Sequence, residues 1–134
     1  MARIADSRHE AREAFDAYFE NCPSRRLLEC ISDKWVVLIL SRLSENSMRY
    51  SELAAKISGI SPKMLTQTLR SLERDGLVNR NVTPSVPPRV DYELTGLGHS
   101  LTLRIAPLKA WAENNMATIQ EARDRYDSGA REDS

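Results

Sequence analysis

The segment from Ser61 to Gly76 constrains the fold of this chain more than any other part of the sequence. Ser61-Pro62 combines a residue that caps helix N-termini with a proline at the first helical position, and Gly76 suits the position that ends a helix. At 3.6 residues per turn, the leucines between them fall on one face: Leu65, Leu69 and Leu72. The pattern predicts an amphipathic helix from Pro62 to about Asp75.

The segments on either side of this helix predict a helix-turn-helix followed by a wing. Before it, Ser51 is placed to cap a two-turn helix, SELAAKIS, which Gly59 ends, and residues 48–50 are long enough only for a very short strand. After it, residues 77–82 and 90–94 alternate apolar and polar side chains as strands do. Because the connecting sequence TPSVPPR holds three prolines, it forms an extended loop rather than a tight turn.

Three helices are predicted before this unit. Residues 4 to about 19 carry apolar side chains at helical spacing, and Pro23 is placed to open a second helix, RRLLECI. Asp33 can cap a third helix, KWVVLILSRL, which is apolar nearly all round. A helix of that composition belongs in the middle of the fold.

A long last helix is predicted after the wing. Thr95 caps it, and it runs from about Gly96 to about Tyr126, with Pro107 expected to kink or split it. Residues 127–134, DSGAREDS, are polar and are predicted to be a disordered tail. The expected architecture is therefore one domain over residues 1–134, mainly α with a small β-hairpin.

Composition excludes several classes of protein. The chain has 134 residues, which is the size of one domain. Its apolar runs are shorter than the roughly 18 residues of a membrane span, and its start is too densely charged for a signal peptide, so we expect a cytoplasmic protein with no membrane partner. Two cysteines and two distant histidines (His9 and His99) cannot form an ordinary zinc site, and we expect no metal and no cofactor.

An enzyme is also not indicated. The sequence has no glycine loop that would hold phosphate, and no nucleophile accompanied by a base and an orienting group. The net charge is zero, but residues 61–90 hold five basic and two acidic side chains, whereas residues 113–134 hold six acidic side chains and three arginines. This asymmetry suggests one basic working surface.

The second helix of the helix-turn-helix supplies the candidate contacts with DNA. Its polar side chains share one stripe, and they can bond guanine or adenine edges, phosphates and thymine methyl groups. Two arginines beside the proline-rich loop add a wing that can contact a minor groove or its phosphates. The alternative is an ordinary solvated helix face with incidental loop arginines. The candidate DNA-binding residues are Ser61, Lys63, Thr66, Gln67, Arg70, Arg74, Arg80 and Arg89.

Four sequence blocks in this order resemble the HxlR-type winged helix-turn-helix regulators, a bacterial family related to MarR-like repressors. The blocks are CPSRRLLECISDKW, ISPKMLTQTLRSLERDGLVNR, PPRVDYELTGLG and PLKAW, and the resemblance covers roughly residues 22–111. One departure is Asp33, where members often have glycine, although aspartate still caps a helix. The resemblance implies a dimeric transcription factor, most often a repressor, that binds palindromic operators on double-stranded DNA.

In several members of this family, a cysteine before a proline senses oxidants or electrophiles, and Cys22 matches that position. If Pro23 is the first helical residue, Cys22 is the N-cap, where the helix dipole and two nearby arginines (Arg25 and Arg26) favour a thiolate. The alternative is a small, inert, partly buried cysteine, and that structural reading is the one we adopt for Cys30.

The remaining question from sequence concerns partners. The last helix carries apolar residues beyond what a small core can bury, and residues 1–20 offer more, so we predict a homodimer built on the two terminal helices. The apolar residues of the last helix are Leu97, Leu101, Ile105, Leu108, Trp111, Ala112 and Ile119. Two alternatives stay open: a regulator with a small-molecule pocket and no thiol chemistry, and a winged-helix module used only for protein contacts.

Overall fold

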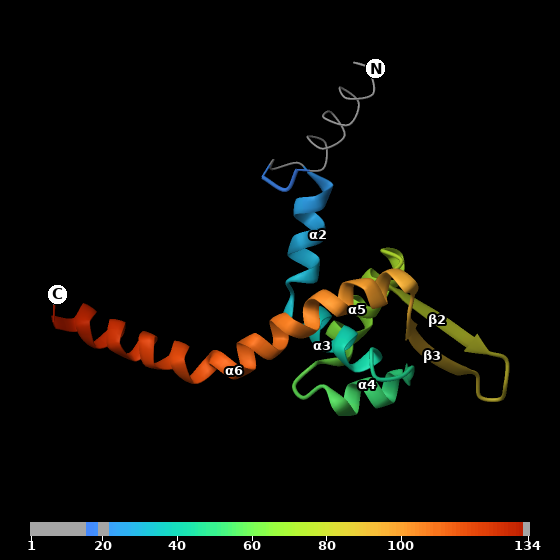
Figure 1. Ribbon diagram of the computed structural model, residues 1–134. Coiled ribbons are helices and arrows are strands. Elements are labelled where there is room, and N and C mark those ends of the chain that lie inside the picture. Colours follow the sequence, from blue (N-terminus) through green and yellow to red (C-terminus); the bar gives the residue numbers. More distant parts are fainter. Residues whose placement is uncertain (1–15, 19–21, 133–134) are drawn as a thin grey trace, which may run out of the picture.

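The computed structural model describes residues 16–18 and 22–132 of the chain. Within these residues, five helices and three strands follow one another in the order predicted for a winged helix-turn-helix (Figure 1). The strands form one antiparallel sheet in the order β1-β3-β2. The predicted fold class is confirmed. The elements are α2 (Pro23–Ile31), α3 (Lys34–Leu43), β1 (Met48–Arg49), α4 (Tyr50–Lys56), α5 (Pro62–Arg74), β2 (Val78–Thr83), β3 (Arg89–Leu94) and α6 (Gly96–Glu132).

The predicted N-terminal helix lies almost wholly outside the described residues. Within residues 16–18 the chain forms a turn, in which the Asp16 side chain accepts a hydrogen bond from the Tyr18 N–H at 3.0 Å. The expected helical conformation is therefore wrong for these three residues. Among the described helices, none combines the length and the apolar composition that crossing a membrane requires.

The local start signals of three helices are confirmed. Pro23 is the first residue of α2, with Cys22 as its N-cap. Asp33 caps α3 by accepting a hydrogen bond from the Trp35 N–H at 2.8 Å. Thr95 precedes α6 and accepts from the Gly98 N–H at 3.0 Å. At α3 and α6 a side chain accepts from an unpaired N–H of the first turn, whereas Pro23 lacks the N–H that would otherwise be unpaired at the start of α2.

The start of α4 differs from the prediction. Arg49, not Ser51, is the N-cap, and its N–H donates to the Glu52 side chain at 3.2 Å. The chain passes directly from β1 into α4, so the pairing of β1 with β3 fixes where the helix begins. At its other end α4 stops at Lys56, before Gly59, which has a positive φ of 85° in the turn that follows.

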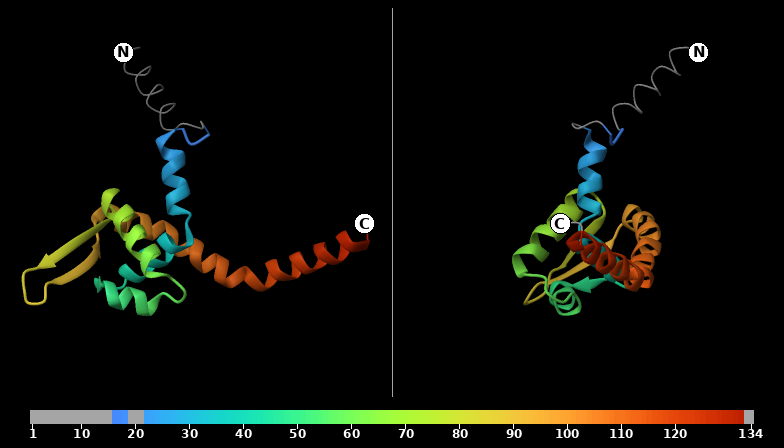
Figure 2. Two further views of the ribbon diagram at one scale, coloured as in Figure 1. Left: turned by 180° about the vertical axis from the view of Figure 1, so that it is seen from behind. Right: turned by 90° about the vertical axis from the view of Figure 1, so that its left-hand side faces the viewer.

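The core forms around α3, the central apolar helix. Its buried side chains pack with those of α4, α5, the sheet and the first half of α6, while α2 stands away from the body (Figure 2). Burying this apolar surface supplies most of the driving force for folding. The core comprises Val36, Ile39, Leu40, Leu43, Met48, Leu53, Ile57, Leu65, Leu69, Leu72, Leu77, Val78, Leu94 and Ile105.

Helix α6 is longer than predicted. It continues through Pro107 without splitting and runs to Glu132, so the predicted disorder is wrong for residues 127–132. Hydrogen bonds between side chains four residues apart, such as Lys109 to Glu113 at 3.0 Å, support the exposed part of the helix. Its second half projects away from the rest of the described chain (Figures 1 and 2).

The apolar residues of α6 divide into two groups. Ile105 is buried and Leu101 is half-buried against the core, so these two residues belong to the part of the set that the core does bury. Leu108 and Trp111 remain 65% and 57% exposed. The expectation of uncovered apolar surface therefore applies to the later turns of α6 and to Leu97 at its start.

Candidate DNA-binding site

Helix α5 begins and ends at the predicted residues. The Ser61 hydroxyl accepts a hydrogen bond from the Met64 N–H at 3.1 Å. At the other end, Leu77 N–H donates to Leu72 O (2.9 Å) and Gly76 N–H donates to Glu73 O (3.1 Å), while Gly76 adopts a φ of 74°. This is a Schellman motif, which requires the left-handed conformation that glycine adopts readily.

The two faces of α5 are separated as the spacing predicts. Leu65, Leu69 and Leu72 are at most 2% exposed and anchor the helix on the core. The opposite stripe faces solvent, and within the described part of the chain none of its three cations forms an ion pair. This uncompensated charge can attract phosphates. The exposed stripe, hereafter the α5 stripe, consists of Lys63, Gln67, Arg70 and Arg74.

Thr66 has a different position from its neighbours on the helix. It is half-buried, and its hydroxyl donates to the Tyr50 hydroxyl at 3.4 Å, which in turn donates to the Pro62 carbonyl at 3.0 Å. These bonds connect the start of α4 to the first turn of α5. Thr66 and Tyr50 therefore help to fix the angle between the two helices of the helix-turn-helix.

The two wing arginines lie on opposite faces of the hairpin. Arg80 on β2 pairs with Tyr92, whereas Arg89 on β3 pairs with Thr83. Because side chains alternate along a strand, Arg80 shares the face of the buried Val78, and Arg89 is on the other face. Both side chains are exposed, but they extend from opposite faces, so they do not point in the same direction toward DNA.

The proline-rich loop suggested that Arg89 projects by itself, but in the structure its side chain is bonded to Asp91. Its Nε donates to Asp91 Oδ2 at 2.9 Å and its Nη2 donates to Asp91 Oδ1 at 3.4 Å. Across the sheet, the register places Arg49 of β1 directly opposite Asp91. Sequence reasoning missed Asp91 and Arg49, and only the alternation of Arg89 and Asp91 along one strand could have indicated that they share a face.

The two cysteines have distinct surroundings. Cys22 is 4% exposed and its carbonyl accepts from the Arg25 N–H at 3.1 Å, in the first turn of α2. Cys30 is half-buried; burial raises the pKa of its thiol, and the carboxylates of Asp75 and Asp33 raise it further. Because the thiolate is the nucleophile, Cys30 is less reactive at neutral pH than an ordinary cysteine.

The described residues include no cluster of three or more His, Cys, Asp or Glu that could hold a metal ion. They do form a hollow of about 380 Å³ between α2, α3 and α5. Gln67 of the α5 stripe lines it together with Cys30, Arg26 and Asp33.

The fold and the site together define a winged helix-turn-helix protein, in which α4 and α5 form the helix-turn-helix and β2 and β3 form the wing. Residues 30–120 match the HxlR-like helix-turn-helix family. The chain therefore belongs to this family of transcriptional regulators, whose members are generally not enzymes.

Relatives agree with this assignment. The HTH-type transcriptional regulator YtfH of Escherichia coli (strain K12) is 45% identical over 107 residues, which cover 80% of this chain and 85% of YtfH. The solved structure of the transcriptional regulator ytfH from Salmonella typhimurium superposes with a TM-score of 0.76 at 42% identity, covering 80% of this chain and 96% of that one. The redox regulator HypR in its oxidised form gives a TM-score of 0.65 at 36% identity, covering 70% and 97%.

Proposed function

We propose that this protein is a sequence-specific repressor that binds a palindromic operator, with α5 in the major groove and the wing against the adjoining backbone. The observation that carries this proposal is the α5 stripe, which presents three cations and an amide on one exposed face of a helix anchored by buried leucines. Lysine and arginine can bond guanine edges, and glutamine can bond adenine in two places. A repressor of this kind lowers transcription by occupying DNA at a promoter.

The salt dependence of duplex binding tests this function against a module used only for protein contacts. Duplexes are first selected from random sequences with the purified protein. We expect log affinity for the selected duplex to fall linearly with log salt, with a slope of about −0.9 for each phosphate neutralised. A protein-contact module would select no duplex, and that result would exclude the proposed function.

We further propose that the protein acts as a homodimer through α6. One recognition helix contacts only a few base pairs, whereas two related by a two-fold axis contact both halves of a palindrome. At about 100° per residue, Leu108, Ala112 and Ile119 share one stripe of α6, and Tyr126, which is 75% exposed, extends it. Exposed apolar patches of this kind mark interfaces between proteins.

The dimer is tested by sedimentation. We expect the wild-type protein to sediment at about twice the 15.2 kDa of one chain, because the apolar stripe of α6 is then covered. Leu108→Glu places a charge on that stripe and should give monomers. Leu103→Glu is the matched control, since Leu103 is 74% exposed and lies on the opposite side of α6. A 15.2 kDa wild-type species at tens of micromolar would exclude the dimer.

We also propose that Cys22 makes operator binding sensitive to oxidants. Two observations support this: Cys22 is the N-cap of α2, directly before Pro23, and the similar protein HypR is described as a redox regulator. Oxidation of this buried thiol to a larger, polar sulfenic acid would disturb the start of α2.

Hydrogen peroxide, which converts a thiolate to a sulfenic acid, tests this role. We expect peroxide to weaken operator binding by wild-type protein and by Cys30→Ser, and to leave Cys22→Ser unaffected. Cys30→Ser is the matched control because the pKa of the Cys30 thiol is raised. Operator release that persists unchanged in Cys22→Ser would show that Cys22 is structural.

A response to a small molecule is the second candidate for regulation. The hollow between α2, α3 and α5 favours it, because Gln67 lines that hollow and also belongs to the α5 stripe. A ligand held there would contact a side chain that we propose to bind DNA. Effector binding that weakens operator affinity equally in Cys22→Ser and in wild-type protein would support this candidate over thiol chemistry.

A further inference from the structure

One carboxylate of the wing is bonded to Arg89 and lies opposite Arg49 in the strand register. Asp91 of β3 accepts two hydrogen bonds from Arg89, at 2.9 and 3.4 Å, and is the less exposed member of that pair, with 21% of its side chain accessible against 52% for Arg89. Arg49 of β1 is its cross-strand partner. Directly opposed residues in an antiparallel pair have Cβ atoms about 4.5–5.5 Å apart, so Arg49 is a near neighbour of the same carboxylate.

The two hydrogen bonds to Asp91 hold the Arg89 guanidinium in place but use only some of its N–H donors. A guanidinium has five N–H donors, and Asp91 uses one on Nε and one on Nη2. Three donors remain for a phosphate or a base edge. Arginine side chains have many rotamers, and holding the guanidinium in place before binding reduces the entropy lost when DNA binds.

From this geometry we infer that Asp91 is a positioning residue for DNA recognition: it holds Arg89 of the wing in the orientation that contacts DNA. The inference rests on the proposed DNA-binding function and assigns a new residue to it. It also gives a reason for an acidic side chain on a surface that approaches a polyanion. Asp91 strengthens binding although its own charge is repelled by phosphates.

Replacement of Asp91 separates positioning from simple electrostatics, because the two predict opposite changes in affinity for the selected duplex. If charge alone mattered, Asp91→Ala would bind the selected duplex more tightly, since an acid is removed. We expect instead that its affinity falls about fivefold, which corresponds to ordering one arginine side chain. Asp91→Asn, which keeps one oxygen acceptor for Arg89, should recover part of this loss.

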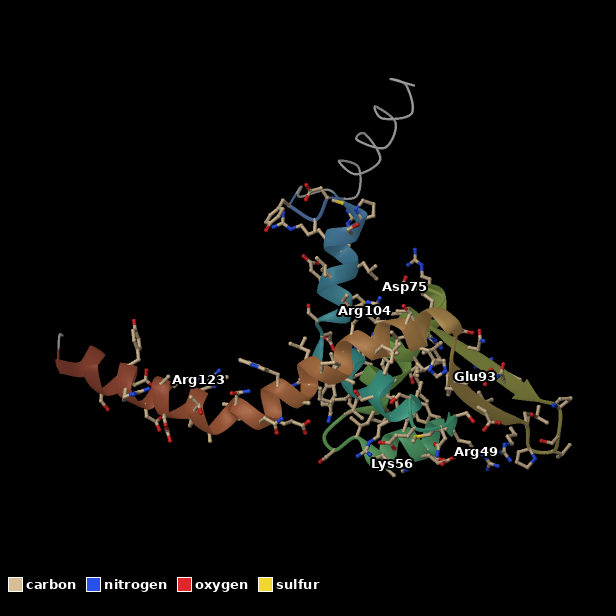
Figure 3. The ribbon with its side chains drawn as sticks, in the orientation of Figure 1. Arg49, Lys56, Asp75, Glu93, Arg104 and Arg123 are labelled. Atoms are coloured by element: carbon tan, nitrogen blue, oxygen red, sulfur yellow. The ribbon has the colours of Figure 1, made fainter. Side chains whose placement is uncertain are left out.

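Glu93 provides the matched control. This residue, labelled in Figure 3, lies two residues along β3 on the same face, but its Oε1 accepts from the Asn81 amide at 2.8 Å rather than from an arginine. Glu93→Ala therefore removes the same charge from the same face without releasing Arg89. We expect its affinity to be unchanged or slightly higher, and thermal denaturation should show that each variant is folded.

A double-mutant cycle with Arg89 completes the test. Arg89→Ala should weaken binding about tenfold and lower the salt slope by about one, as the loss of one charged phosphate contact predicts. Asp91→Ala should not lower the slope, and it should cause no further loss when Arg89 is already alanine. If Arg89→Ala weakens binding and Asp91→Ala does not, the inference is wrong; if Arg89→Ala has no effect, the wing contact of the proposed function is wrong as well.

Discussion

We expect the Gln67→Ala/Arg70→Ala double variant to lose roughly 2–6 kcal/mol of binding free energy on the selected duplex, because each side chain is expected to contribute about 1–3 kcal/mol. Both residues are exposed on the α5 stripe, on the side of the helix opposite the buried leucines. The loss should be specific to sequence. Binding to a duplex of unrelated sequence depends mainly on phosphate contacts and should change much less.

Titration of the selected and unrelated duplexes at one salt concentration measures this effect. Arg125→Ala is the control for charge, because it removes the same kind of cation from the part of α6 that projects away from α5 (Figure 1), on the side of the helix away from Leu108 and Ile119. It should bind as wild-type protein does. Equal losses on both duplexes would mean that Arg70 contacts phosphates only, and an unchanged affinity in the double variant would exclude α5 as the recognition helix.

The second large effect is expected at Gly98, where α6 passes the end of the wing. A Cβ at this position would overlap the Leu77 carbonyl oxygen and lie 3.3 Å from a Leu94 methyl group. Thr95 holds the junction closed, since its N–H donates to Leu77 O at 3.1 Å and its hydroxyl donates to Gly76 O at 2.6 Å. The backbone atoms at this junction therefore have little freedom to move apart.

Gly98→Ala should consequently lower the free energy of unfolding by about 1–3 kcal/mol, the usual cost of forcing extra volume into a packed site. Gly96→Ala is the matched control: it lies in the same first turn of α6, and its Cβ would meet nothing within 4 Å. Because alanine favours helix, we expect Gly96→Ala to be neutral or to stabilise by up to about 1 kcal/mol. Denaturant titrations at one protein concentration compare the two, and equal stabilities would contradict the close approach.

The sequence could not predict which side chains of the wing share a face or lie opposite one another, because this depends on the register of the strands. The alternation of residues 77–82 and 90–94 indicates two strands, but a shift of one residue in their pairing exchanges the faces of every side chain. Only the observed register places Arg80 and Arg89 on opposite faces and brings Arg49 opposite Asp91. These pairings join residues distant in the chain, and no local pattern encodes them.

The prediction of a disordered C-terminal tail was also wrong, for a different reason. Polar composition made residues 127–134 look disordered, yet α6 extends to Glu132, since helical bonds propagate along a helix that has already started. Likewise, spacing alone could not separate the buried Ile105 from the exposed Leu108. Which of them meets the core depends on how far α3 and the sheet extend along α6.

The sequence by itself determined the helix-turn-helix and the α5 stripe. Ser61, Pro62 and Gly76 act on backbone groups within a few residues of themselves, and the 3.6-residue period separates leucines from cations without reference to the rest of the chain. The tertiary structure alone decided what surrounds those cations. It bonded Thr66 to Tyr50, placed Arg49 opposite Asp91 across the sheet, and left Lys63, Gln67 and Arg70 exposed. Such contacts depend on the packing of separate elements, which short-range preferences do not specify.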